Sequence, residues 1–419
     1  MKRSLLSVFC VFTLSLPLFP QLTLESCQHE ARENYPLIVQ YDLIEKAKEY
    51  NLGNASKGYL PQFSLTARAT YQSDVTKLPV ELPNVSIKAL PKDQYQVMLE
   101  LQQNIWDGGN IRSRKEIVRS GADVERERVN VDIYTLNERV NQVYFGILLL
   151  DEQLLQNQLL QDDLQRSYLQ VSAYMQNGIA NQSDLDAIKV EQLNTKQRKT
   201  ELTVAREAYY QMLSLLTGKQ VSPDARLTKP SDAESTISSV INRPELFWFD
   251  AQNESLRAQE DALQTHYLPK LGLFVQGAYG NPGLNMLKNE FSPFYIAGVR
   301  LSWNFGSLYT LRNDKRLIEN NRQRLMSNRN IFIFNTQLQA TQEGNSIRSL
   351  QNLMKEDDEI ITLRKNIRKA AEVKVANGTL TVTEMLREIT AENMARQTKA
   401  LHEIQLLMNI YQLKYTTNN

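Results

Sequence analysis

The stretch YLPQFSLTARATYQ, residues 59–72, decides the fold, because a similar stretch, YLPKLGLFVQGAYG, occurs at residues 267–280. In both, a Tyr-Leu-Pro triplet closes a helical segment and opens an alternating one. Phe63 and Leu65 flank the polar Ser64, and the alternation continues to the end of the stretch. A period of two is typical of a strand with one apolar face. The chain therefore contains two copies of one unit, each with a strand that begins after the proline.

Further matches between the copies are separated by a constant 200 positions. They are Asn104 and Asn304, Arg112 and Arg312, and the pairs Asn177-Gly178 and Asn377-Gly378. The stretches between these matches thus keep equal length in both copies. Equal lengths suggest long helices that pair along their whole length, which we call rods. No proline occurs between 107 and 223, or after 294, as the interior of a continuous helix requires.

The rods carry apolar residues at spacings of four and three, which predicts a coiled coil. The outgoing rod shows them at Val129, Ile133, Leu136, Val140, Val143, Ile147, Leu150 and Leu154. The returning rods show them at Leu202, Ala205, Tyr209, Met212 and Leu216, and at Leu401, Ile404, Met408, Tyr411 and Tyr415. A helix over 112–178 would be roughly 100 Å long. We expect the Asn-Gly pairs to end the outgoing rods, and Ser183 and Thr383 to precede the returning ones.

Three further segments alternate like the first strand and complete a β-hairpin in each copy. Each segment is about the 9 to 11 residues that a strand needs to cross a bilayer. A soluble sheet with one wet face would alternate in the same way, and that interpretation stays open. If the strands cross a membrane, four are too few to close a barrel. Several subunits must therefore contribute strands to one barrel, since an open sheet would leave unpaired edges in lipid. Arg68, Glu100 and Arg300 then fall on the face assigned to the lumen.

The N-terminus predicts export, because Met1-Lys2-Arg3 is followed by an apolar run to Phe19. Beyond it no run of 18 apolar residues predicts a membrane helix.

Cys27 has two interpretations. Glu25 and Ser26 fit a lipoprotein cleavage box poorly, and a buried helical cysteine is the alternative.

Charge and motif content exclude several function classes. A net charge of +1, from 48 basic and 47 acidic residues, gives no footprint for nucleic acid. His29, His266 and His402 are isolated, and the chain has no zinc-protease, phosphate-loop or nucleophile-elbow motif. We therefore expect no enzyme activity, no cofactor and no metal site.

These patterns predict a mainly α protein with a membrane β portion. We expect a signal peptide at 1–20, a first repeat at 21–216, a linker at 217–242 and a second repeat at 243–419. The first repeat comprises a short helix, a β-hairpin at about 60–106 and a helical hairpin with its tip near 178. The second comprises a helix, a β-hairpin at about 269–305 and a helical hairpin with its tip near 378.

The whole mature chain resembles the TolC-like outer-membrane efflux proteins. The resemblance rests on Gln21-Leu-Thr-Leu-Glu-Ser-Cys, Tyr59-Leu-Pro-Gln-Phe, Trp106-Asp-Gly-Gly with Arg112, and the segments following both tip glycines. It implies a homotrimer with a shared twelve-stranded β-barrel and an α-helical tube in the periplasm. It also implies the exit duct of a tripartite efflux pump or a type I secretion system. The implied partners are a periplasmic adaptor (membrane fusion) protein, an inner-membrane transporter of the resistance-nodulation-division or ABC type, and outer-membrane lipid.

The resemblance also implies site residues at the tips. Asn177, Gly178, Asn377 and Gly378 would dock the adaptor, while Asp184 and Glu384 match the family's acidic constriction. Where the family can place a second acidic ring, this chain has Arg387, which would instead pair with Glu384. Charge stabilisation of the helix N-terminus is the alternative role for both acids. A periplasmic adaptor or structural coiled-coil protein is the rival function, although an adaptor should have a single hairpin.

Overall fold

The computed structural model describes residues 22–75, 91–230, 240–286 and 288–419. The predicted signal peptide, and residues 231–239 of the predicted linker, lie outside them. By its contacts the chain divides into two units. The first takes the described parts of Met1–Ile38, Ile133–Asn242 and Thr336–Asn419, and the second those of Val39–Asp132 and Arg243–Asn335.

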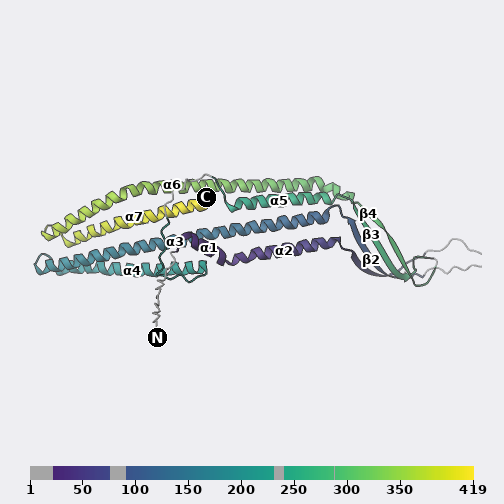
Figure 1. Cartoon of the computed structure of the whole chain (residues 1–419), viewed down its shortest axis with the longest axis horizontal. Coiled ribbons are helices and arrows are strands. Elements are labelled where there is room, and N and C mark those ends of the chain that lie inside the picture. Colours follow the sequence, from purple (N-terminus) through teal and green to yellow (C-terminus); the bar gives the residue numbers. More distant parts are fainter. Residues whose placement is uncertain (1–21, 76–90, 231–239, 287) are drawn as a thin grey trace, which may run out of the picture. The chain divides into compact units, whose positions relative to one another are not determined.

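The two longest helices are α3 (Asn110–Gln176) and α6 (Leu308–Ala376), which supply residues to both units. In the first unit α4 (Gln182–Thr217) returns along α3, and α7 (Val382–Thr417) returns along α6 (Figure 1). The two returning helices each have 36 residues. Two long helical hairpins of matching length are thus confirmed. The short α1 (Leu24–Asn34) and the 3-10 turn η1 (Pro36–Ile38) complete this unit.

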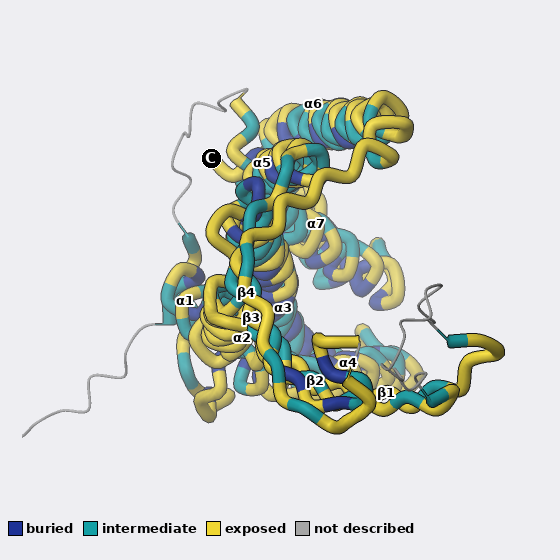
Figure 2. Tube along the Cα trace, turned by 90° about the vertical axis from the view of Figure 1, so that its right-hand side faces the viewer, coloured by how far each residue is buried: buried dark blue, intermediate teal, exposed yellow. Residues whose placement is uncertain are grey.

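The predicted seam is borne out on α3 and corrected at one position of α4. On α3 every seam residue from Val129 to Ile147 is buried. On α4 the predicted Leu202 is buried, and the predicted Tyr209 and Leu216 are partly buried against the core. The predicted Met212 is instead 47% exposed, and its neighbour Leu213 is buried. The prediction was wrong at Met212 alone among these residues, because the adjacent Leu213 is also apolar and takes the buried position. Figure 2 shows buried residues recurring along α7.

The core beside α1 also holds the N-terminal segment. The Tyr144 hydroxyl lies 2.8 Å from the carbonyl oxygen of Leu22 and 2.6 Å from that of Thr228. Leu22 forms a parallel β-bridge with Leu227. Cys27 lies inside α1 and is fully buried. Burial and the nearby Glu30 raise the pKa of the Cys27 thiol to about 11, which matches the interpretation as a packed helical cysteine.

The second unit contains the sheet. Its strands are β1 (Gln62–Tyr71), β2 (Asp93–Trp106), β3 (Lys270–Asn281) and β4 (Ser292–Ser302), all antiparallel in the order β1-β2-β3-β4. Its helices are α2 (Val39–Ser56) and α5 (Pro244–Thr265), with 3-10 turns η2 (Lys57–Tyr59) and η3 (Phe305–Ser307). Two helical hairpins and two β-hairpins confirm the mainly α repeat architecture.

The turn from β2 into α3 is built by Asp107 and two glycines. One Asp107 carboxylate oxygen accepts from the Gly109 amide at 3.0 Å, and the other accepts from the Ile111 amide at 2.7 Å. Gly108 and Gly109 have φ of 68° and 84°, which other L residues rarely adopt. The Asp-Gly-Gly sequence therefore turns the chain and satisfies the first free amides of α3.

None of the helices in the described part of the chain combines the length and apolar character that crossing a membrane requires.

Candidate functional sites at the hairpin tips and on the sheet

Both hairpin tips end their outgoing helix in the same way. The Gly178 amide donates to the Met175 carbonyl at 3.1 Å, and the Ile179 amide to that of Tyr174 at 2.9 Å. Gly378 and Thr379 repeat these two bonds at 2.9 Å each. This pattern of two backbone hydrogen bonds is the Schellman motif. The motif requires a positive φ, which is 73° at Gly178 and 68° at Gly378 and which favours glycine. The preceding Asn177 and Asn377 do not adopt positive φ.

Each returning helix begins with a capping box, a reciprocal pair of side-chain to backbone bonds. Asn181 accepts from the Asp184 amide at 3.1 Å, and the Asp184 carboxylate accepts from the Asn181 amide at 2.9 Å. Thr381 and Glu384 form the same pair at 3.2 and 3.1 Å. The prediction that Ser183 and Thr383 precede these helices was wrong. Both lie in the first turn, because the capping residue stands three positions before the acid.

Glu384 is engaged by Thr381 rather than by Arg387. Its carboxylate also accepts from the Thr381 hydroxyl at 2.8 Å. The backbone and side-chain bonds from Thr381 lower the pKa of Glu384, and the charge of Arg387 makes the smallest contribution. The tip acids Asp184 and Glu384 thus stabilise the first turns of their helices.

Behind the tips an apolar cluster joins all four long helices. Its buried members are Leu164, Val171, Leu185, Ile188, Ala371, Val375, Val382, Met385, Leu386 and Ile389. Met385 of α7 is 1% exposed and Ile188 of α4 is 0% exposed, so each hairpin places a side chain in the centre of the cluster. Because both hairpins contribute, they pack as one body in this region.

A group of charged side chains, which we name the hairpin ion network, lies on three of these helices, α3, α6 and α7. It comprises Asp163, Arg368, Glu372, Glu392 and Arg396. Arg368 of α6 donates to Asp163 of α3 at 2.9 Å, and its Nε lies 3.0 Å from Glu392 of α7. The Glu392 side chain is only 3% exposed, and Arg396 donates to it at 2.6 Å. One guanidinium thus connects three helices.

The sequence did not point to this network. Arg368 and Asp163 are 205 positions apart, and nothing local marks either as a partner. The local signals are charged pairs four apart, such as Glu392 with Arg396, which are common on exposed helices. His402, which is isolated from other histidines in the sequence, lies 2.8 Å from the buried Asp357.

The register of the sheet places the predicted lumen residues on one face. Arg68 is opposite Gln96, Glu100 is opposite Gln276, and Arg300 is opposite Gly272. Arg300 lies 3.5 Å from Glu100. The other face carries the apolar set Phe63, Leu65, Val97, Leu99, Leu101, Val275, Tyr279, Tyr295, Val299 and Leu301. Two chemically distinct faces therefore run across all four strands.

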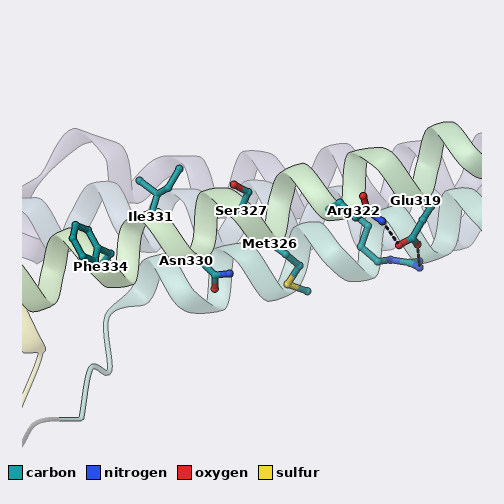
Figure 3. A pocket seen from close by; sticks show the side chains of 8 residues that line it. Glu319, Arg322, Met326, Ser327, Asn330, Ile331 and Phe334 are labelled. Carbon is teal, nitrogen blue, oxygen red and sulfur yellow. Dashed lines mark hydrogen bonds and ion pairs between the residues drawn. The ribbon is translucent and has the colours of Figure 1, made fainter.

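An open groove on α6, shown in Figure 3, has a partly apolar lining. This groove of about 580 Å³ is lined by Glu319, Arg322, Gln323, Met326, Ser327, Asn330, Ile331 and Phe334. All eight belong to α6, and Arg322 pairs with Glu319 at 3.1 Å. Phe334 and Ile331 are 65% and 54% exposed.

Within the described residues, no group of three or more His, Cys, Asp and Glu side chains could hold a metal ion.

The comparisons with known proteins agree with this geometry. Residues 28–219, just under half of the chain, match the family model described as outer membrane efflux protein. No curated protein sequence matches the chain significantly. The matched residues include the first β-hairpin and the first helical hairpin, where Trp106-Asp-Gly-Gly and Asn177-Gly178 carry the resemblance stated above.

Solved outer-membrane proteins share the fold. The outer membrane protein VceC of Vibrio cholerae is 13% identical, with a TM-score of 0.68 over 94% of this chain and 96% of its own. The Campylobacter jejuni CmeC outer membrane channel is 14% identical, with a TM-score of 0.64 over 94% and 85%. The open Neisseria gonorrhoeae MtrE outer membrane channel is 12% identical, with a TM-score of 0.66 over 94% and 89%. At these identities the likeness establishes the fold.

Proposed function

We propose that the chain is one subunit of an outer-membrane export channel. The premise is that the chain is TolC-like, in the sequence of residues 28–219 and in the fold of nearly its whole length. It acts as the exit duct of a tripartite efflux or secretion system. The channel is a passive conduit that extends into the periplasm, and energy comes from its transporter partner.

The four-stranded sheet carries this proposal. Within the described residues β1 pairs with β2 alone and β4 with β3 alone, so both edges of the sheet offer unpaired backbone groups. The apolar face is strongly exposed, with Phe63 at 67%, Leu65 at 70% and Tyr295 at 77%. Such an apolar face is suited to contact with lipid. In lipid the backbone groups at both edges also need hydrogen-bond partners. Three copies that join β4 of one to β1 of the next satisfy both edges and give the twelve-stranded barrel.

The same association covers the groove on α6. Helix α6 follows β4, and α2 precedes β1, so joining these edges brings α6 of one copy near α2 of the next. Helix α2 exposes Val39, Leu43 and Tyr50 at 56%, 57% and 69%, with spacings of four and seven that suit a coiled-coil seam. The second copy is therefore the occupant that fits the exposed Ile331 and Phe334.

The tips are the proposed site of docking and gating. Three copies present six Asn-Gly turns, at Asn177-Gly178 and Asn377-Gly378, to a periplasmic adaptor beside a transporter of the resistance-nodulation-division or ABC type. Asp184, Glu384 and Arg387 lie within the first two turns of the helices that follow. In a narrow trimeric opening their charges would influence which ions pass.

The geometry favours this function over that of a periplasmic adaptor. An adaptor should combine one helical hairpin with compact β domains, whereas this chain has two helical hairpins and one continuous sheet in its described part. Export of small molecules and export of proteins are two versions of the same proposal, since the transporter selects the cargo.

The test combines membrane separation with conductance. We expect the expressed protein in the outer-membrane fraction, and discrete ion-conducting events when the purified protein enters a planar lipid bilayer. A matched control is Phe63→Asp with Leu65→Asp, which places charge on the apolar face and should prevent insertion. Recovery of the unaltered protein as a soluble periplasmic species without conductance would contradict the proposal.

A further inference from the structure

The polar face of the sheet carries an unequal set of charges. Along the described strands this face alternates with the apolar one, and its ionisable residues are Arg68, Glu100, Lys270 and Arg300. Three of the four are basic, although the whole chain is almost neutral with a net charge of +1. The excess of positive charge is therefore a property of this surface rather than of the composition.

The single acid on this face of the described strands is already compensated. Arg300 lies 3.5 Å from the Glu100 carboxylate, and Gln102 donates to the same carboxylate at 2.7 Å. The Glu100 side chain is only 14% exposed, against 49% for Arg300. The Arg300 guanidinium also lies 4.8 Å from the centre of the Phe274 ring, which helps to fix it above the sheet. This pair contributes little net charge to its surroundings.

The other two basic residues face neutral neighbours. Arg68 is exposed and donates to the Gln96 side-chain oxygen at 3.2 Å. Lys270 is exposed, opens β3 and is opposite Ser302 in the ladder. Arg68 lies well inside β1, whereas Lys270 lies at the strand end that follows α5. Positive charge is thus placed at two levels along the sheet.

We propose that the polar face of the sheet selects anions, with Arg68 and Lys270 as the residues that determine the selectivity. This inference rests on the proposed channel, in which three copies turn each residue into a ring around the lumen. A passage lined with one sign of charge concentrates ions of the opposite sign, and rings of Arg or Lys are the usual lining of anion pores. The permeants favoured by this segment carry net negative charge.

The tip acids Asp184 and Glu384 act in the opposite sense, so the experiment must locate the effect. The potential at zero current is measured in a planar bilayer across a KCl gradient at low salt, where screening is weak. The double variant Arg68→Gln with Lys270→Gln should lower the chloride-to-potassium permeability ratio by roughly twofold or more. Glu100→Gln, which frees Arg300 from its carboxylate, should raise the ratio.

Two controls make the outcome specific. Arg68→Lys keeps the charge and should leave the ratio unchanged, while a trimer on native gels shows that each variant assembles. An unchanged or increased ratio in the double variant would overturn the inference and leave the channel itself intact. A complete lack of conductance in the unaltered protein would instead overturn the proposed function, and the inference with it.

Discussion

Arg368 of α6 donates a hydrogen bond to Asp163 of α3 at 2.9 Å, and so joins the second helical hairpin to the first. The two side chains are 17% and 25% exposed, which places them in a poorly screened environment. Arg368 also lies 3.0 Å from the buried Glu392 of α7. The hairpins are therefore held together by charge as well as by the apolar cluster behind their tips.

Replacing Arg368 by Gln should destabilise the helical region by about 2 kcal/mol. Removing one partner from a fully buried pair costs ~3–5 kcal/mol, and the partial exposure of Arg368 reduces this value. Asp163 and Glu392 would both lose their shared cation, although Glu392 keeps Arg396. The measurement is the denaturant midpoint of the detergent-solubilised protein, followed by circular dichroism.

Arg364→Gln is the matched control for that change. Arg364 lies one turn earlier on α6 and pairs with Glu388 at 3.4 Å, but it is 44% exposed. An exposed pair contributes below about 1 kcal/mol. Equal losses in the Arg364 and Arg368 variants would show that burial of the network is irrelevant to stability.

The capping boxes predict a second set of effects. Asn181→Ala and Thr381→Ala should each cost about 1 kcal/mol, because one helix amide loses its acceptor. The loss should appear as faster amide hydrogen exchange in the first turns of α4 and α7. Ser183→Ala and Thr383→Ala serve as controls inside those turns and should leave exchange nearly unchanged. The reverse ranking would restore the sequence-based assignment of the helix starts.

Tyr210 predicts a loss of stability at high pH. It is buried and donates to the Ala225 carbonyl at 2.7 Å. Burial, followed by the charge of Asp151, raises its pKa to about 12, whereas a free tyrosine has a pKa of about 10. The unfolded state therefore loses this proton first, and stability should fall as pH rises from about 10 to about 12.

Tyr210→Phe should weaken that pH dependence while lowering stability at neutral pH, since the bond to Ala225 is lost. The check is the unfolding midpoint as a function of pH, with phenolate absorbance recorded in parallel. Early phenolate formation in the folded protein, attributable to Tyr210 by comparison with the variant, would refute the prediction.

Cys27 should behave as an unmodified and protected thiol. Its side chain is fully buried, and its pKa is raised to about 11, so little thiolate forms at neutral pH. We expect no reaction with iodoacetamide at mildly alkaline pH in the folded protein, and complete reaction in denaturant. A thiol that stays unreactive after unfolding, together with the mass of attached acyl chains, would instead support lipidation.

Much of the fold was predictable because it depends on local patterns. The repeated Tyr-Leu-Pro, the alternation after it and the Asn-Gly pairs each act through backbone preferences of neighbouring residues. Phase errors arose where local signals were ambiguous. Met212 lies beside the true seam residue Leu213, and both are apolar, so spacing alone could not separate them.

The sites were less predictable, because their key contacts are distant in sequence. The placement of Arg68, Glu100 and Arg300 on one face followed from alternation, since side chains of one parity share a face. The contact between Arg368 and Asp163 depends on how two hairpins meet, which no single segment encodes. The role of Glu384 in the capping box could have been foreseen from Thr381, which stands three positions before it.

The most direct test of the central claim is the mass of the native particle extracted from the outer membrane in mild detergent. The shared-sheet account predicts three chains per particle, because three copies satisfy the free edges of β1 and β4. Native mass spectrometry should therefore give three times the mass of the mature chain. A particle of one or two chains, or a soluble species that needs no detergent, would contradict it.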